Sequence, residues 1–308
     1  MKKEPISCEY IMHMGDDLNV VNNARVSFDK ESEWHRSCWS CDYVGPADSD
    51  GCPQCGVDNC GWLEDAGTLS EGDQGLIRFL ATGFRKSEWN EMIQGVRSMS
   101  DLEIHKLFLK LRRHATHWAP MAHPHIQVRI TAPIFLARQY VKHQIGLTWS
   151  EVSRRYVDDE PSFWFPDGWR ARPEGGIKQG SSDVLVEEIT GWKLVSETNW
   201  ERSRQHPQDL AEAITEGALG AYLDMIEAGV APELARINLP QNMMVTWRWT
   251  GSLAAFARVC QQRCDSHAQK EAQILGKQIS SIMAGLFPVS WDAMVGECLG
   301  HLETGESK

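Results

Sequence analysis

Long apolar runs are missing from this sequence of 308 residues, and so is an excess of positive charge. No run reaches the roughly 18 apolar residues that a membrane-spanning helix needs. The first residues, MKKEPISCEYIMHMGDD, are too polar for the apolar part of a signal peptide. The formal net charge of −11 argues against a nucleic-acid backbone as the main partner, although a local basic pocket could still hold a small anion. We therefore expect a cytoplasmic protein that binds neither membrane nor nucleic acid.

Internal repeats and low-complexity segments are also absent, and the composition, 42% hydrophobic and 24% charged, is typical of a globular protein. Ile126, Val128 and Ile130 alternate as in a strand, and a helical pattern follows Pro133. Residues 157–205, rich in Trp, Pro and Gly, indicate a long ordered loop with short elements. A strand and a short helix are expected over 10–28, and further helices over 73–84, 207–229 and 251–285.

The nine cysteines are more typical of thiols or metal ligands than of disulfides in a cytosolic chain. Four of them form two CxxC pairs joined by a short loop, CWSCDYVGPADSDGCPQC: Cys38, Cys41, Cys52 and Cys55. Four thiolates at this spacing suit tetrahedral zinc, and a closed thiolate sphere indicates a structural site. The alternative, two redox-active pairs, lacks the βαβ context such pairs usually have. We predict a zinc-ribbon-like module inserted over 34–62.

The polar stretch SEVSRRY follows the apolar segment APIFLARQYV closely. Glu151, Ser153 and Arg155 recur at a period of two, so they would share one face if the segment is extended. A carboxylate, a hydroxyl and a guanidinium together can bind a ligand that carries hydrogen-bond donors and a phosphate. A Glu–Arg pair on a wet surface is an equally good interpretation.

A second polar group lies in RVCQQRCDSHAQKE, within the expected helix 251–285. Arg263 and His267 would share a helix face beside the apolar residues Phe256 and Val259. On spacing alone, a solvated arginine is the better interpretation of Arg263. His117, in HATHWAPMAHPHIQ, is by default a structural histidine.

Together these segments resemble the flavin-dependent thymidylate synthases. PIFLARQYVKHQIGLTWSEVSRRY is similar to the family's PIF-x-x-RQ segment and its signature RHR-x-x-S-x-N-E-x-S-x-R-Y. HWAPMAHP is similar to H-x-T-P-F-E-H, GVAPELARINLP to A-R-x-x-L-P, and RCDSHAQKE to R-x-D-x-x-A-Q-x-E. MGDDLNVVNNARVSF is similar to the family's N-terminal strand and helix. The blocks occur in the family's order over most of the chain.

The resemblance implies an α/β fold of the α+β kind, with a mainly antiparallel sheet and long helices. It implies one catalytic domain over 1–308, with the zinc module 34–62 and a helical insertion 86–115 as additions. It also implies a homotetramer whose active sites lie at subunit interfaces. The family's flavin pocket is not a Rossmann site, which accounts for the missing GxGxxG motif.

The activity implied is one-carbon transfer from methylenetetrahydrofolate to C5 of a deoxypyrimidine monophosphate, dUMP to dTMP, with FAD as cofactor and NADPH as its reductant. Arg263 and His117 are the implied catalytic residues, Arg263 stabilising charge at the pyrimidine edge. The implied substrate-binding residues are Gln139, Lys142, Glu151, Ser153, Arg154, Arg155, Arg236 and Arg263. The implied flavin-binding residues are His117, Lys142, His143, Gln144, Glu151, Ser252 and Arg258.

Several positions depart from the family pattern. RHR has become Lys142-His143-Gln144, one residue is inserted before Glu151, and the usual Asn is Ser150. Lys and Gln cannot reproduce a guanidinium fork, so flavin contacts must be rearranged. These changes suggest an alternative product, 5-hydroxymethyl dCMP or dUMP, formed by water attack on the methylene intermediate, as in viral enzymes; the location would then be the host cytoplasm. A non-catalytic zinc-containing binding protein is the third hypothesis.

Overall fold

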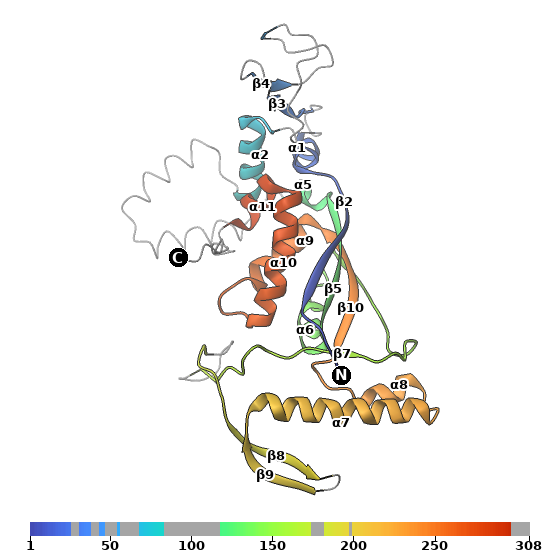
Figure 1. Cartoon of the computed structure of the whole chain (residues 1–308). Helices are drawn as coiled ribbons and strands as arrows, with labels where there is room; N and C mark the ends of the chain where they lie inside the picture. The colour runs from blue at the N-terminus through green and yellow to red at the C-terminus, as the bar shows by residue number, and fades with distance from the viewer. Residues whose placement is uncertain are drawn as a thin grey trace. The chain divides into compact units, whose positions relative to one another are not determined.

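The computed structural model describes residues 1–25, 31–37, 43–46, 54–55, 68–82, 118–173, 182–196 and 199–296 (Figure 1). The chain divides into two compact units. Unit 1 comprises Met1–Ile11, Gln127–Thr250 and Gln262–Ile279. Unit 2 comprises Met12–Ile126, Gly251–Gln261 and Ser280–Lys308. Each unit is therefore built from segments that are far apart in the sequence.

A four-stranded sheet has the order β2-β5-β10-β6. Its strands are β2 (Ser7–Met14), β5 (His125–Pro133), β10 (Met244–Ser252) and β6 (Leu147–Glu151). The two central strands carry the core, because Ile126, Val128 and Ile130 on β5 are completely buried and Trp247 and Trp249 on β10 almost so. The predicted strand at Ile126–Ile130 is confirmed, and so is the helix after Pro133, α6 (Ile134–Tyr140).

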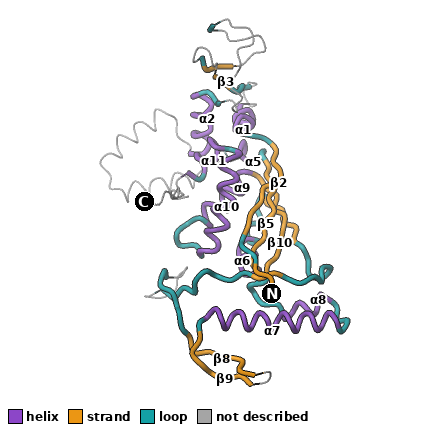
Figure 2. Tube along the Cα trace, in the orientation of Figure 1, coloured by secondary structure: helices purple, strands orange, loops and turns teal. Residues whose placement is uncertain are grey.

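Helices make up most of the remaining regular structure (Figure 2). The other helices are α1 (Asp17–Arg25), α2 (Glu71–Thr82), α5 (Ala119–Ala122), α7 (Pro207–Glu227), α8 (Pro232–Ala235), α9 (Leu253–Arg263), α10 (Lys270–Leu286) and α11 (Pro288–Met294), with a 3-10 turn, η2, at Arg236–Asn238. The predicted helices at 73–84 and 207–229 are confirmed to within a few residues, as are the strand and helix predicted over 10–28 where the structure describes them.

The single helix predicted over 251–285 is wrong, because the chain leaves the helix after Arg263 and starts α10 at Lys270. Asp265 explains the break: its carboxylate accepts from the His267 backbone N–H (2.8 Å), and its carbonyl accepts from the Ala268 N–H (2.9 Å). Short polar side chains compete with helical hydrogen bonds in this way. Arg263 and His267 therefore do not share a helix face.

The described residues also form three small two-stranded sheets. β1 (Lys2–Lys3) pairs in parallel with β7 (Ser162–Phe163), and β3 (His35–Ser37) pairs antiparallel with β4 (Val44–Pro46). The hairpin of β8 (Ile189–Ser196) and β9 (Asn199–Gln205) is antiparallel. It lies in the region predicted as a long loop with short elements, a prediction that did not place this hairpin. The predicted fold class, helices with antiparallel strands, is confirmed.

In unit 2, the start of α2 is held by a buried carboxylate. Asp73, 4% exposed, accepts hydrogen bonds from Arg25 Nη2 (2.6 Å), Ser32 Oγ (2.8 Å) and Ser70 Oγ (2.7 Å). The Ser70 hydroxyl in turn accepts from the Asp73 backbone N–H (3.1 Å). The Ser70 hydroxyl therefore caps α2 by satisfying one of its first N–H groups, and the Asp73 carboxylate holds that hydroxyl in place. The same carboxylate joins three chain segments.

Two sequence predictions fall largely outside the described residues. Of the zinc-module cysteines only Cys55 is described, and the helical insertion 86–115 is not. Within the described part of the chain, no group of three or more His, Cys, Asp or Glu side chains is arranged to hold a metal. Zinc thus stays a prediction. Among the helices that the structure describes, none has both the length and the apolar character to cross a membrane.

Candidate active site

The polar stretch after α6 is anchored by the apolar helix before it. Tyr140, completely buried at the end of α6, donates its hydroxyl to the Ala272 carbonyl of α10 (2.7 Å). Lys142 and Gln144 then emerge with exposed side chains, and Gly146 turns the chain with φ +76°, a conformation that favours glycine. The apolar run thus fixes the start of a loop in which Lys142 and Gln144 are exposed and His143 between them is half-buried.

Arg263 is held at the end of α9 by two directed contacts. Its Nε donates to His143 Nε2 (2.9 Å), and Nη2 donates to the Gln139 carbonyl (2.8 Å). The guanidinium also lies 5.6 Å from the centre of the Tyr140 ring. Gly276 allows α10 to approach Arg263 closely, because a Cβ at position 276 would lie only 3.3 Å from Arg263 Cβ. This half-buried fork is therefore fixed in position, and its other N–H groups can serve a ligand.

His143 accepts a hydrogen bond from a cation, so its Nε2 cannot carry a proton. Burial, and then the positive charge of Arg263, lower the pKa of His143 to about 4. The ring is therefore neutral at pH 7, with its proton on Nδ1. Arg263 therefore remains the donor and His143 the acceptor across the physiological pH range.

We expect His143 to titrate near pH 4, well below an ordinary histidine at about 6.5. The unfolded chain takes up this proton first as the pH falls below about 6.5, so protonation lowers stability between about pH 6.5 and pH 4. Imidazole ¹⁵N NMR, with the His143→Gln variant for assignment, measures the midpoint and the tautomer. A midpoint near 6.5, or a neutral ring protonated on Nε2, would contradict this arrangement.

A series of side-chain hydrogen bonds within unit 1 starts at Gln139. Gln139 Nε2 donates to Gln269 Oε1 (2.5 Å), and Gln269 Nε2 donates to Glu271 Oε2 (2.8 Å). Arg170 Nη2 donates to Glu271 Oε1 (2.5 Å). Sequence reasoning missed Arg170, Gln269 and Glu271 as site residues. Gln269 and Glu271 lie in the block RCDSHAQKE, which was a usable signal, whereas Arg170 has no motif around it.

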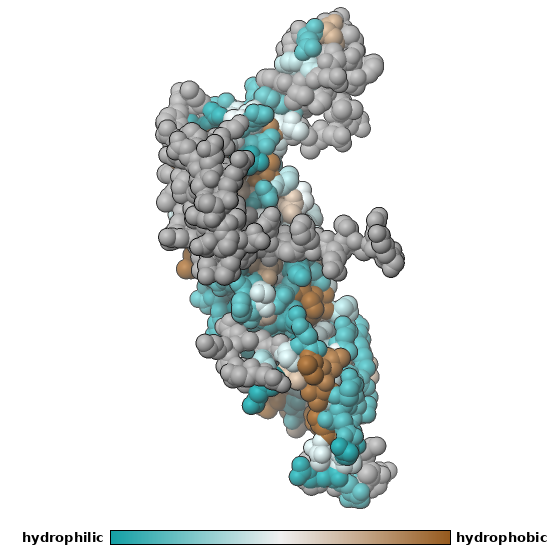
Figure 3. Space-filling view, turned by 90° about the vertical axis from the view of Figure 1, so that its left-hand side faces the viewer, coloured by the Kyte–Doolittle hydropathy of each residue, from teal (hydrophilic) through white to brown (hydrophobic). Residues whose placement is uncertain are grey.

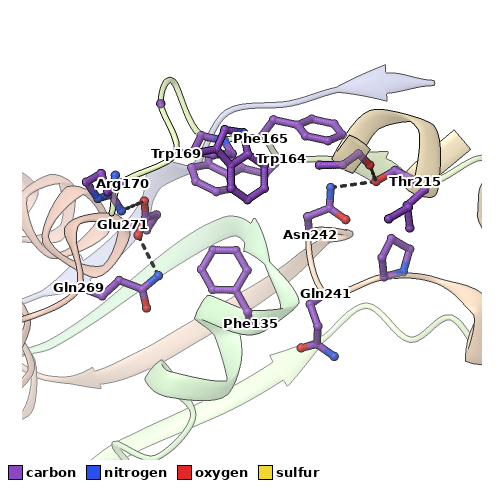
Figure 4. Close-up of a pocket in the computed structure, with 15 residues that line it drawn as sticks. Phe135, Trp164, Phe165, Trp169, Arg170, Thr215, Gln241, Asn242, Gln269 and Glu271 are labelled. Carbon is purple, nitrogen blue, oxygen red and sulfur yellow. Dashed lines mark hydrogen bonds and ion pairs between the residues drawn. The ribbon is translucent and has the colours of Figure 1, made fainter. Parts of the chain in front are cut away.

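Of these residues, Arg170, Gln269 and Glu271 line one end of a cavity of about 540 Å³ in unit 1, a size typical of small-molecule sites. Phe135 and Trp164 meet edge to face in its wall, with ring centres 5.7 Å apart. At the other end, Asn242 Nδ2 donates to Thr215 Oγ1 (3.4 Å). Figure 4 shows the labelled wall residues: Phe135, Trp164, Phe165, Trp169, Arg170, Thr215, Gln241, Asn242, Gln269 and Glu271.

The segment SEVSRRY is extended only up to Glu151, where β6 ends. The condition under which its three polar residues would share one strand face is therefore not met. Ser153 and Arg155 still meet, since Arg155 Nε donates to Ser153 Oγ (3.2 Å). Glu151 accepts from Trp149 Nε1 (3.1 Å), and among the described contacts no Glu151–Arg155 ion pair is found. Trp149 stacks on Trp247 at 4.2 Å, which is a packing role.

The remaining predicted residues lie apart from this cluster in their contacts. Arg154 pairs with Asp159 Oδ1 (2.8 Å), and Arg236 Nε donates to the Glu233 carbonyl (3.2 Å) from an exposed turn. Ser252 is buried, and its Oγ accepts from the Ala255 N–H at the start of α9 (3.3 Å). Arg258 is exposed on α9, and His117 lies outside the described residues. The structure thus joins Gln139, His143 and Arg263 directly.

Comparison with known proteins agrees with these features. The profile of the family described as "Thymidylate synthase complementing protein" matches residues 68–289. A flavin-dependent thymidylate synthase of Kosmotoga olearia is 33% identical over 192 residues, 62% of this chain and 75% of that protein. One of Thermosipho africanus is 30% identical over 189 residues, 61% of this chain and 75% of that protein.

Solved structures show the same fold. The UMP/dUMP methylase PolB from Streptomyces cacaoi, solved with 5-Br dUMP, has a TM-score of 0.57 at 20% identity and covers 95% of this chain and 96% of its own. The structure with 5-Br UMP has a TM-score of 0.59 and covers 95% of each. The predicted family and the predicted enzyme class, a methyltransferase, are confirmed. The chain belongs to the thymidylate synthase complementing protein family, that of the flavin-dependent thymidylate synthases.

Proposed function

We propose that this protein transfers a one-carbon unit from methylenetetrahydrofolate to C5 of dUMP and releases dTMP, using FAD reduced by NADPH. Family membership supports the reaction class. The observation that carries the proposal is the fork of Arg263, fixed by a neutral imidazole and a backbone carbonyl. A cation held in this way cannot reorient when charge changes beside it, which electrostatic catalysis requires.

In this reaction, Arg263 lies at the carbonyl edge of the pyrimidine. As C5 becomes nucleophilic, negative charge grows on the ring oxygens, and the remaining N–H groups of Arg263 donate to it. A donor of this kind contributes about 3 kcal/mol to transition-state stabilisation. His143 and the Gln139 carbonyl orient the guanidinium. His117 is proposed as the second catalytic residue.

The nucleotide phosphate is assigned to residues around the end of β6. Arg155, exposed and contacting Ser153 Oγ, offers a guanidinium and a hydroxyl at one point. Arg236, exposed in the turn after α8, is a second cation for the same group. Arg154 is committed to Asp159, so it would orient the turn and give the phosphate a weaker contact. Guanidinium groups suit phosphate because they bind two oxygens at once.

The residues present fit a flavin. Lys142, Gln144 and Glu151 are exposed and offer an ammonium, an amide and a carboxylate, which suit the polar edge of an isoalloxazine and a pyrophosphate. Bound FAD, once reduced by NADPH, would supply the hydride that reduces the transferred carbon. His143 would contribute its Nδ1 proton as a donor, since its Nε2 is taken by Arg263. Ser252 and Arg258 are proposed as further flavin-binding residues.

A homotetramer is proposed as the working assembly. Large apolar side chains beside the proposed site are exposed: Ile145 (80%), Tyr156 (77%) and Ile237 (76%). Figure 3 likewise shows apolar side chains gathered in patches on one face. Exposed apolar groups next to binding residues are typical of a site that a neighbouring subunit completes. The zinc module at Cys38, Cys41, Cys52 and Cys55 and a cytoplasmic location are also proposed.

Product analysis tests the proposed function. Purified protein is incubated with dUMP or dCMP, labelled methylenetetrahydrofolate and NADPH, and the nucleotides are separated. We expect 5-methyl dUMP from dUMP, and flavin absorbance in the purified protein. A hydroxymethyl product would overturn methylation in favour of the alternative reaction. Protein without flavin and without affinity for pyrimidine monophosphates would overturn both.

A further inference from the structure

The series of hydrogen bonds that links Arg170, Glu271, Gln269 and Gln139 has a defined donor-to-acceptor direction. Arg170 can only donate, and the ionised carboxylate of Glu271 can only accept. Glu271 is 3% exposed; burial alone would raise its pKa, but hydrogen bonds from Arg170, the backbone and Gln269 outweigh it and keep the pKa low. The carboxylate is therefore charged at pH 7, and one end of the chain is fixed as an acceptor.

Glutamine has a donor and an acceptor on the same planar group, so fixing one side fixes the other. Glu271 requires the amide nitrogen of Gln269 on its side, which turns Gln269 Oε1 towards Gln139. That oxygen requires the amide nitrogen of Gln139, and Gln139 Oε1 is left pointing away from the chain. Among the described residues, no protein donor to Gln139 Oε1 is found.

We propose that Glu271, anchored by Arg170, sets the amide orientation of Gln269 and Gln139 so that Gln139 presents a carbonyl oxygen to the nucleotide. Arg170, Gln269 and Glu271 are thus positioning residues, and Gln139 selects for a ligand N–H or O–H donor. A base N–H and a sugar hydroxyl both qualify, whereas an ionised phosphate does not. This inference rests on the proposed function and narrows the contact that Gln139 makes.

The geometry predicts which substitutions reverse the donor–acceptor direction of these hydrogen bonds. In Glu271→Gln, the new carbonyl faces Arg170 and the new amide nitrogen faces Gln269, which must turn over. Gln139 turns over as well and presents N–H groups to the ligand donor. In Gln139→Glu alone, two acceptors face each other at Gln269. The double variant Gln139→Glu/Glu271→Gln again pairs every donor with an acceptor and presents an oxygen to the ligand.

The experiment measures the dUMP dissociation constant by calorimetry for the wild type, both single variants and the double variant. We expect Glu271→Gln to weaken binding roughly three- to ten-fold and Gln139→Glu roughly ten-fold or more, from the loss of one hydrogen bond or the creation of an unpaired acceptor. The double variant should return to within about three-fold of the wild type. Glu216→Gln, on the exposed side of α7, is the matched control and should bind as the wild type does.

Two further arms identify the donor and separate this inference from the proposed function. Wild-type affinity for 3′-deoxy dUMP and for N3-methyl dUMP shows which group faces Gln139; undiminished affinity for both would overturn the assigned contact. Thermal unfolding without nucleotide tests the series of hydrogen bonds separately from nucleotide binding. The Tm losses of the single variants should partly cancel in the double variant. If the Tm losses of the two single variants simply add in the double variant, the proposed series of hydrogen bonds is wrong. If the losses cancel but the protein never binds dUMP, only the proposed function is wrong.

Discussion

Replacing Arg263 with lysine is expected to lower the rate of dTMP formation by roughly 10²- to 10³-fold. Two directed bonds, to His143 Nε2 and the Gln139 carbonyl, fix the plane of the guanidinium. A lysine ammonium is a point charge without a planar fork, so it cannot satisfy both acceptors and still donate to the pyrimidine edge. The loss should appear mainly in kcat, because the interaction strengthens as charge develops.

Single-turnover kinetics and the dUMP dissociation constant together measure this effect. Arg248→Lys is the matched control: Arg248 is exposed on β10, and the substitution should leave the rate within about two-fold. The flavin content of both variants should match the wild type. If Arg263→Lys keeps the full rate, Arg263 does not stabilise the transition state and the assignment fails.

Asp73→Asn is expected to lower the free energy of unfolding by about 3 kcal/mol, because it leaves Arg25 without its counter-charge and breaks hydrogen bonds to Ser32 or Ser70. Denaturant unfolding followed by tryptophan fluorescence measures this loss. The matched control is Asp292→Asn, at an exposed position on α11, which should change stability by no more than about 0.5 kcal/mol. A loss no larger than the control's would show that Asp73 does not hold the start of α2.

The contribution of Asp73 should also depend on pH in one direction. Burial alone would raise the pKa of Asp73, but hydrogen bonds from Ser70, Ser32 and Arg25 outweigh it and hold the pKa below its usual range. Because the folded state binds the proton less tightly than the unfolded state, the stabilisation is complete above the ordinary aspartate pKa of about 3.9. It is lost as the pH falls below that value. The difference between wild type and Asp73→Asn should therefore shrink below about pH 4.

The sequence predicted the parts of the fold whose pattern repeats. Strict alternation identified β5, and the residue pattern after Pro133 identified α6. It failed at the break after Arg263, because an apolar stripe on both sides suggested one helix while a single side chain, Asp265, ended it. It expected short elements in 157–205 but did not place the β8–β9 hairpin, whose charged residues, as in WERSRQ, give no clean alternation. Local hydrogen bonds and edge pairing leave little trace in hydrophobic periodicity.

The sequence likewise identified some residues of the candidate site and missed others. Motif resemblance identified Gln139, His143 and Arg263, which the structure joins by hydrogen bonds. It could not identify Arg170, which meets Glu271 across about a hundred residues of sequence, because such pairing depends on tertiary packing alone. Nor could it reveal the neutral state of His143, which follows from burial and the charge of Arg263.

The break between α9 and α10 has a consequence for how the chain can vary. Arg263, at one end of the connector, binds the backbone carbonyl of Gln139, and Gln269, at the other end, binds the side chain of the same residue. The connector therefore sets the spacing between two contacts with one glutamine. Its residues can be exchanged where their side chains face solvent. Adding or removing even one residue would prevent both contacts from forming together, so the length of the connector is the property that selection must preserve here.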